Sequence, residues 1–211
     1  FETGIFSAAI WISGILGENQ LSANQIALNL ASMTFMVANG LGITAMIRVG
    51  NQLGTRNYAN LRRVAFSVFL LVLCTQAFFA GLLAILRDWL PSLYLEMDNV
   101  EKATTNAAVI SEAANLLLIA AIFQISDGLQ VTALGALRGM QDAKVPMVIT
   151  FIAYWLIAFP ILCALGLHTS LGTMGIWIGL LTGLTAAAIC LLYRFNYMSL
   201  RLIANRHKLS N

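Results

Sequence analysis

An aspartate lies inside one of the most apolar stretches of this 211-residue sequence. Asp127 occurs in FQISDGLQV, residues 123–131, between the uncharged stretches ANLLLIAAI and TALGAL. Gln124 and Gln130 lie three residues to either side. On a helix with about 100° between successive residues, they fall about 60° to either side of Asp127. The spacing predicts a polar helix face centred on a carboxylate.

A carboxylate in an apolar environment needs a basic partner or a functional role. Placing an ionised aspartate at the centre of a membrane helix costs about 2.5–3.5 kcal/mol on insertion scales. The only Lys or Arg in the apolar segments given below are Arg48 and Arg194, each near the end of its segment, so no cation lies near the depth of Asp127 to form an ion pair with it. A protonated, hydrogen-bonded Asp127 with a structural role is the alternative.

Glu2 is a second acid in an apolar segment, at a depth similar to that of Asp127. A position nearer the membrane edge is the alternative for Glu2. Two carboxylates at similar depth without an internal cation suit the binding of a proton or a small cation such as Na⁺. We therefore expect Glu2 and Asp127 to be ion-coupling residues and, if the ion is Na⁺, its ligands.

The composition indicates which solvent surrounds these acids. Hydrophobic residues make up 59% of the chain and charged residues only 10%, whereas a soluble domain carries about 25% charged residues. A membrane-spanning helix needs about 20 mostly apolar residues. The sequence predicts an all-α integral membrane protein with six spans. Because the first span is short, we also expect the chain to be a fragment that begins within a helix. The spans are 1–17, 24–53, 64–86, 113–137, 145–165 and 171–194.

Basic residues are distributed unevenly between the connections. Ten of the twelve Lys and Arg fall in alternate connections and in the C-terminal tail. Because cytoplasmic loops accumulate Lys and Arg, we expect these connections and the C-terminus to be cytoplasmic. The net charge of +3 then reflects topology and indicates no nucleic-acid partner. The ten are Arg48, Arg56, Arg62, Arg63, Arg138, Lys144, Arg194, Arg201, Arg206 and Lys208.

Segment 24–53 carries a second polar stripe. Gln25, Asn29, Ser32 and Asn39 fall within about 80° of one another around a helix. Such a stripe must face protein or a water-filled cavity, and hydrogen bonding between helices is the alternative reading. We expect segments 24–53 and 113–137 to share a cavity that is lined by Asn29, Ser32, Asn39, Gln124 and Gln130.

Local signals predict three structural features. Asp142 precedes segment 145–165 and is expected to cap its helix. Pro160 cannot donate a hydrogen bond to the Leu156 carbonyl and is expected to kink the same helix. Glycines recur every four residues in segment 171–194, at 175, 179 and 183, which favours close approach of another helix.

Catalytic and metal-binding signatures are missing from the sequence. His168 and His207 have no third ligand nearby, and neither an H-E-x-x-H nor a G-x-x-x-x-G-K-[ST] motif occurs. Cys74, Cys163 and Cys190 lie in three different spans, far from any pairing motif. We therefore expect neither an enzyme nor a cofactor.

Three segments together resemble a known family. NQIALNLASMTFMVANGLGITAMIRVGNQLG (24–54), FQISDGLQVTALGALRGMQDAKVPM (123–147) and YWLIAFP (154–160) are similar to the C-terminal half of multidrug and toxic compound extrusion (MATE) transporters of the NorM-like branch. The resemblance implies one six-helix lobe of a twelve-helix transporter. It also implies export of cationic or amphipathic compounds across the bacterial cytoplasmic membrane in exchange for Na⁺ or H⁺.

The resemblance also implies partners and site residues. The partners are drug-like cations, membrane lipid and an N-terminal six-helix lobe, and the family's acids match Glu2 and Asp127. Relatives often have His-Gln where this chain has Asn24-Gln25, and some have a coordinating tyrosine at the position of Phe123. These departures leave Na⁺ and H⁺ open as coupling ions. An ion-channel subunit and a lipid-linked sugar flippase remain the alternative functions, and saturable flux that depends on a counter-gradient would exclude a channel.

Overall fold

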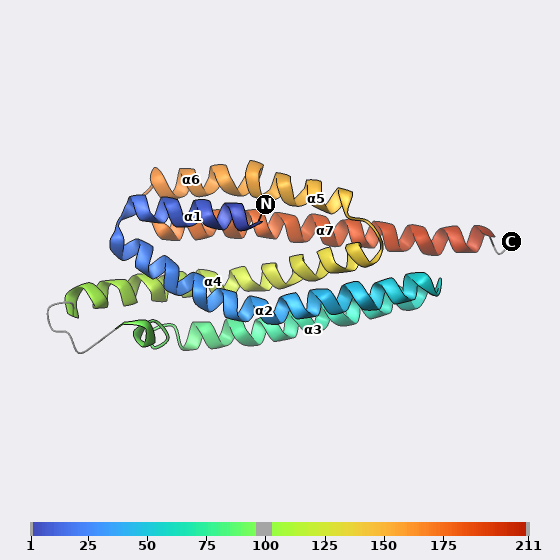
Figure 1. Cartoon of the computed structure of the whole chain (residues 1–211), viewed down its shortest axis with the longest axis horizontal. Coiled ribbons are helices and arrows are strands. Elements are labelled where there is room, and N and C mark those ends of the chain that lie inside the picture. The colour runs from blue at the N-terminus through green and yellow to red at the C-terminus, as the bar shows by residue number, and fades with distance from the viewer. Residues whose placement is uncertain (1, 96–102, 210–211) are drawn as a thin grey trace.

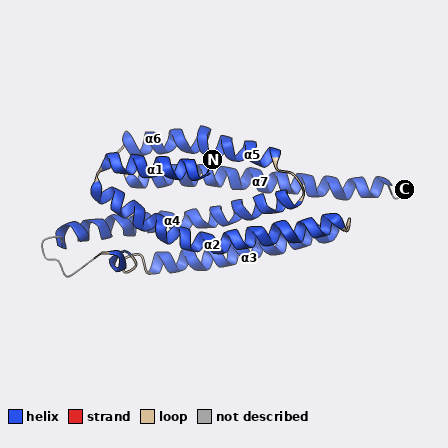
Figure 2. Ribbon diagram, in the orientation of Figure 1, coloured by secondary structure: helices blue, strands red, loops and turns tan. Residues whose placement is uncertain are grey.

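A computed structural model describes residues 2–95 and 103–209 of the chain, and in these residues every regular element is helical (Figure 2). The fold is an all-α bundle (Figure 1). Its elements are α1 (Glu2–Leu16), α2 (Glu18–Gly54), α3 (Tyr58–Ile85), a 3₁₀ turn η1 (Pro91–Tyr94), α4 (Ala103–Gly139), α5 (Lys144–Phe151), a π-helical segment η3 (Ile152–Ala158), α6 (Phe159–Leu167) and α7 (Thr173–Leu209).

Five helical stretches are long and apolar enough to cross a membrane, namely α2, α3, α4, α7 and the continuous stretch from α5 through η3 to α6. The remaining helix, α1, is apolar but only 15 residues long. Two helices extend well past the predicted spans. α4 begins ten residues before 113, and α7 continues fifteen residues past 194. In both places polar residues continue the helix beyond the apolar segment.

The helices alternate in direction along the bundle (Figure 1). The α2–α3 turn, the α4–α5 turn and the C-terminal part of α7 lie at one end, and the α1–α2 and α6–α7 turns lie at the other (Figure 1). The first end carries the connections that are rich in Lys and Arg. The N-terminal end of α1 lies about midway along the bundle (Figure 1), so Glu2 begins its helix at mid-depth.

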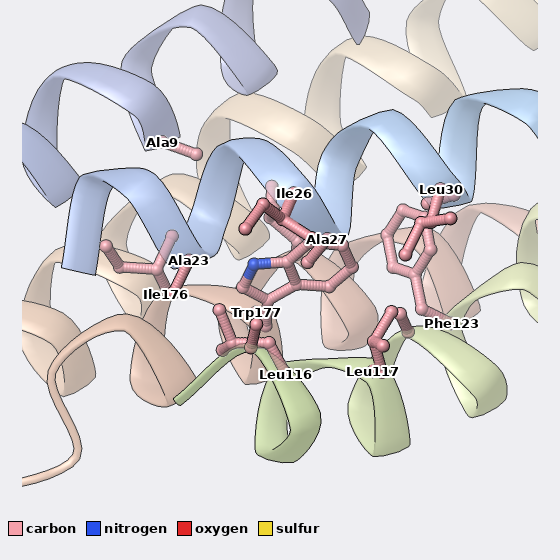
Figure 3. Close-up of a cluster of buried hydrophobic side chains, with 14 of the residues drawn as sticks. Ala9, Ala23, Ile26, Ala27, Leu30, Leu116, Leu117, Phe123, Ile176 and Trp177 are labelled. Atoms are coloured by element: carbon pink, nitrogen blue, oxygen red, sulfur yellow. The ribbon is translucent and has the colours of Figure 1, made fainter. Parts of the chain in front are cut away.

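Two apolar clusters hold the bundle together. At the α1–α2 end, fully buried Trp177 of α7 lies between α2 and α4, against Ala23, Ala27 and Leu116 (Figure 3). The Trp177 indole nitrogen donates to Asn24 Oδ1 at 2.9 Å, which satisfies the indole within the apolar cluster. The second cluster, nearer the other end, includes Leu137 of α4 and Phe195 of α7.

Glycines set the closest helix contacts. A Cβ placed on Gly42 of α2 would lie 3.1 Å from the Val131 carbonyl oxygen, and one on Gly135 of α4 would overlap the Gly42 carbonyl. On α7, a Cβ on Gly175 would lie 2.5 Å from the Leu165 carbonyl oxygen, and one on Gly179 would lie 2.5 Å from the Leu162 Cα. The glycines of segment 171–194 therefore allow α6 to pack closely against α7, as the sequence predicts.

The structure corrects one local expectation. Asp142 does not cap α5, which begins at Lys144 with no side-chain cap. Its carboxylate accepts a hydrogen bond from Arg194 Nε of α7 at 2.8 Å instead. An ion pair to a neighbouring helix replaces the local cap because Asp142 lies in the turn that α7 passes.

The region around Pro160 has a specific backbone form. Ile152–Ala158 is π-helical, and the Phe159 amide donates to the Tyr154 carbonyl, five residues back. α6 then begins with Pro160 in its first turn, where the missing amide is tolerated. The π-helical segment therefore lies immediately before the proline that interrupts the α-helical hydrogen bonds.

Candidate functional site

A cavity of about 580 Å³ opens between α1, α2 and α4. Both anomalous acids, Glu2 and Asp127, line it. We call it the carboxylate cavity. The remaining lining residues are Thr3, Phe6, Ile10, Gln25, Leu28, Asn29, Ala31, Ser32, Phe35 and Phe123.

Asp127 is nearly sealed within the protein. Only 4% of the residue is exposed, and its Oδ1 atom is buried without a hydrogen-bond partner. No Lys or Arg side chain lines the cavity. A buried carboxylate oxygen without a donor is costly, so binding of a proton or a cation at Asp127 would remove an existing penalty.

The α2 wall of the cavity is polar. Asn29 Oδ1 accepts a hydrogen bond from the Tyr94 hydroxyl of η1 at 3.0 Å, and the Ser32 hydroxyl donates to the Leu28 carbonyl at 2.7 Å. Gln25 lines the same wall. The structure therefore brings Asn29 and Ser32 to the cavity that Asp127 also lines.

Three residues that the sequence analysis placed along this cavity do not line it. Gln124 and Gln130 are each 1% exposed, and the amide oxygen and nitrogen of both side chains are buried without partners. They lie to either side of Asp127 on α4, where neighbouring helices cover them. Asn39 is exposed on α2, ten residues or about 15 Å along the helix from Asn29. The polar stripe therefore extends farther than the cavity does.

Tyr154 belongs to the same region, although sequence reasoning did not select it. It lies in η3, is 3% exposed, and its hydroxyl has no hydrogen-bond partner. Its ring belongs to the apolar cluster that also holds Phe123. In the neighbouring position, the Trp155 ring packs against Gly4 of α1, where an added Cβ would lie 3.1 Å from Trp155 Cζ2. η3 therefore contacts the turn of α1 that carries Glu2.

The sequence contained one signal for Tyr154. A tyrosine hydroxyl six residues before a proline in a membrane span is a polar group close to a helix irregularity. The wide π-helical turn itself could not be read from the residues.

Aromatic rings support the wall that carries Asp127. Phe123, one turn before Asp127, makes edge-to-face contacts with Phe6 of α1 at 6.0 Å and with Trp177 of α7 at 5.5 Å between ring centroids. Such contacts stabilise each pair beyond simple burial. Phe123 therefore fixes the α4 wall on the apolar cluster of Figure 3 and presents ring surface to the cavity.

This arrangement suits the binding of a cation. The cavity offers two carboxylates, two amides, two hydroxyls and aromatic ring faces, and both carboxylate oxygens and ring faces attract cations. The part of the chain that the structure describes holds no group of three or more His, Cys, Asp and Glu that could bind a metal ion. A small ion would therefore draw its remaining ligands from hydroxyl, amide or water oxygens.

Comparison with known proteins places this geometry in context. The profile of the family described as MatE matches residues 1–163. The chain is 37% identical over 203 residues to the probable multidrug resistance protein NorM of Xylella fastidiosa (strain 9a5c), which covers 96% of the chain and 41% of that protein. It is 38% identical over 212 residues to the multidrug resistance protein PmpM of Pseudomonas aeruginosa, which covers 99% of the chain and 43% of that protein. The chain thus spans about two fifths of the length of these curated relatives.

Solved structures share the fold. The crystal structure of the eukaryotic MATE transporter AtDTX14 superimposes with a TM-score of 0.79 at 20% identity, over 94% of this chain and 44% of that one. An outward-facing conformation of a multidrug resistance MATE family transporter superimposes with a TM-score of 0.80 at 15% identity, over 96% of this chain and 43% of that one. The helical bundle therefore has the fold of about two fifths of each of these solved chains.

Proposed function

Because the chain belongs to the MatE family, we propose that it forms the C-terminal half of a multidrug efflux transporter that exchanges drug-like cations for Na⁺ or H⁺. Its relatives are named multidrug resistance proteins, and the chain spans 41–43% of their length. A missing N-terminal lobe of six helices would supply the rest. The transporter would carry out no covalent chemistry and would need no cofactor.

The observation that carries the proposal is the position of the two acids. Glu2 and Asp127 come from different helices, α1 and α4, and line one cavity in which no basic side chain offsets them. An ion that binds there neutralises charge that is otherwise held in an apolar environment. The ion drives transport only if it binds one conformation of the cavity more tightly than another.

We propose that Tyr154 completes the ion site. The family resemblance suggests an oxygen ligand at position 123, where this chain has phenylalanine. The Tyr154 hydroxyl is buried without a hydrogen-bond partner in η3, the segment that packs against the turn of α1 carrying Glu2. A tyrosine from the neighbouring span can therefore supply the oxygen that Phe123 lacks.

The cavity has the character that drug-like cations require. Phe6, Phe35 and Phe123 offer aromatic surface, while Asn29 and Ser32 offer polar contacts. Large apolar side chains of α1 and α2 are exposed, including Trp11 and Met36 at 79% and 75%. Lipid or the N-terminal lobe would cover such surfaces.

We also propose an orientation in the membrane. The α2–α3 and α4–α5 turns lie at one end of the bundle with the C-terminal part of α7 (Figure 1). These turns and the helix ends beside them carry Arg48 to Arg63 and Arg138 to Lys144. The positive-inside rule assigns this end to the cytoplasm of a bacterial inner membrane. Ions from outside would then reach the acids when the cavity opens toward the opposite end.

Replacement of Asp127 tests the proposal. In the complete transporter, reconstituted in vesicles with an imposed Na⁺ or H⁺ gradient, Asp127→Asn should abolish gradient-driven efflux of a fluorescent cation. It keeps the side-chain size and removes the charge, so insertion and folding should be preserved.

Glu18→Gln is the matched control, because Glu18 is an exposed acid at the start of α2. Retention of ion-coupled efflux by Asp127→Asn would return Asp127 to a structural role. Flux that neither saturates nor depends on the gradient in the unmodified protein would favour the channel alternative.

A further inference from the structure

A second hollow lies on the outside of the bundle, against the first turns of α3. It has a volume of about 690 Å³ and is distinct from the carboxylate cavity. Residues of α3 form most of it, and Ile203 of α7 closes one side. Its other lining residues are Ala59, Arg62, Arg63, Phe66, Ser67 and Leu70. We call it the α3–α7 groove.

Arg62 is held in this groove with one donor unused. Its Nη2 donates to Asn196 Oδ1 of α7 at 2.6 Å, and its guanidinium carbon lies 5.2 Å from the centroid of the Phe66 ring. Its Nη1 is buried and has no hydrogen-bond partner. A buried donor on a charged group is costly when it is unpaired, and the strongest partner for it is an anionic oxygen.

The charge in the groove is not balanced within the described part of the chain. Arg63 is exposed beside Arg62. The two ion pairs in the described residues are Arg87–Asp88 and Arg194–Asp142, and neither involves these arginines. Two adjacent guanidinium groups therefore face one hollow without a carboxylate.

The other side of the groove is apolar and continues along the membrane-spanning part of α3. Phe66 is 46% exposed and Leu70 is 63% exposed. Leu73, three residues further on, extends the same exposed face. A ligand that matches the whole groove needs negative oxygens at one end and hydrocarbon at the other.

The position of the groove agrees with the depth of a lipid headgroup. Arg62 and Arg63 lie in the second turn of α3, which begins at Tyr58 beside the α2–α3 turn. This end of the bundle also holds the C-terminal part of α7 (Figure 1). Basic pockets between membrane helices at such an end suit anionic headgroups.

From these observations we propose that the α3–α7 groove binds the phosphate of an anionic phospholipid through Arg62 and Arg63, with an acyl chain along Phe66 and Leu70. Asn196 positions the Arg62 guanidinium, and the Phe66 ring supports it from one face. The unused Nη1 donates to a phosphate oxygen. A free inorganic anion would leave the apolar half of the groove without a ligand.

The test measures lipid preference in the complete protein. The protein is placed in nanodiscs of phosphatidylcholine that contain a minor fraction of phosphatidylglycerol, and the retained lipids are counted by native mass spectrometry. Arg62→Gln and Arg63→Gln should each reduce the preference for phosphatidylglycerol about fivefold, which corresponds to about 1 kcal/mol per basic residue near the membrane surface.

Two further measurements keep the test decisive. Arg48→Gln removes an exposed arginine from α2 that does not line the groove, and should lower the preference less than either groove variant does. Arg63 is exposed and makes no hydrogen bond that folding requires, so Arg63→Gln remains informative if Arg62→Gln fails to fold. An unchanged preference in Arg63→Gln, or an equal loss in Arg48→Gln, overturns the proposal. Full competition by soluble glycerol phosphate would show an anion site without the lipid contact.

Discussion

Helices α2 and α4 meet in two different ways along their length. Near Gly42 and Gly135 their backbones touch, because neither residue has a side chain to separate them. Near Asn29 and Asp127 the same two helices border the carboxylate cavity with α1. Residue size explains the difference. Glycine allows one half of the pair to close, while larger polar and aromatic side chains keep the other half open.

The difference suggests that the two halves of the α2–α4 pair have different roles. In the closed half the backbones of the two helices approach closely, which leaves little room for rearrangement. The open half holds Asp127, whose Oδ1 is buried without a partner, and the buried amides of Gln124 and Gln130 lie to either side of it on α4, also without partners. These groups would gain from rearrangement or from an ion, whereas the closed half would lose packing. We therefore expect movement during transport to be concentrated around the cavity.

The largest effect on stability is expected in the closed half. Gly135→Ala places a methyl group against the Gly42 carbonyl, so the helix backbones must separate. We expect a destabilisation of about 3 kcal/mol, measured as a lower apparent melting temperature in detergent.

Gly40→Ala is the matched control, because a Cβ there meets nothing within 4 Å. It should leave the melting temperature unchanged or raise it, since alanine favours helix more than glycine does. Equal melting temperatures for the two variants would show that the helices near Gly135 separate at little cost, and would contradict the difference in packing proposed between the closed and open halves.

An intermediate effect is expected where α7 anchors the end of the closed half. Arg194→Gln removes the 2.8 Å ion pair to Asp142, whose side chain is only 9% exposed. The carboxylate is then left with a weaker partner, at a cost of about 1.5–3 kcal/mol. Thermal melting measures the loss.

Arg201→Gln, at an exposed position on the same helix, should change stability little. The double variant Arg194→Gln/Asp142→Asn should recover part of the loss, because no buried charge remains unpaired. No recovery would indicate that Arg194 acts through packing alone.

The smallest stability effect is expected at the open half. Tyr154→Phe removes a buried hydroxyl that has no hydrogen-bond partner. The apparent melting temperature should therefore change by only about 1 °C, well below the shift that about 1 kcal/mol produces. Ion-driven efflux should nevertheless fall if the hydroxyl contributes to the ion site. A large loss of stability would mean that the hydroxyl is structural, and unchanged efflux would remove Tyr154 from the site.

Much of the fold could be predicted from the sequence because apolar helices in a membrane are long and strongly patterned. The charge deficit and the six apolar segments indicate the bundle, and the glycines at 175, 179 and 183 predict the α6–α7 contact. Asp127 stands out because it is a carboxylate without a cation in its segment. These signals are local in the chain.

Features that depend on distant segments could not be predicted. The partner of Asp142 lies 52 residues away on α7, and Tyr94 reaches Asn29 across 65 residues. Which of the polar residues on α4 reaches the cavity depends on the neighbouring helices, so Gln124 and Gln130 were misplaced. Tyr154 enters the region through a π-helical segment, which residue types alone do not specify.

The π-helical segment also sets the register of its span. The buried positions Pro146, Thr150, Tyr154, Ala158, Leu162 and Gly166 recur at intervals of four residues. In an uninterrupted α-helix each such step turns about 40° past a full circle, or about 200° over the five steps. The residues would then spiral around to the opposite side. The wider turn at Ile152–Ala158 rotates the later residues backward, because its hydrogen bonds join residues five apart. The extra residue in the wider turn thus offsets part of the rotation that the four-residue spacing would otherwise accumulate. Deleting one residue from this segment would turn the Phe159–Leu167 end of the span away from α7.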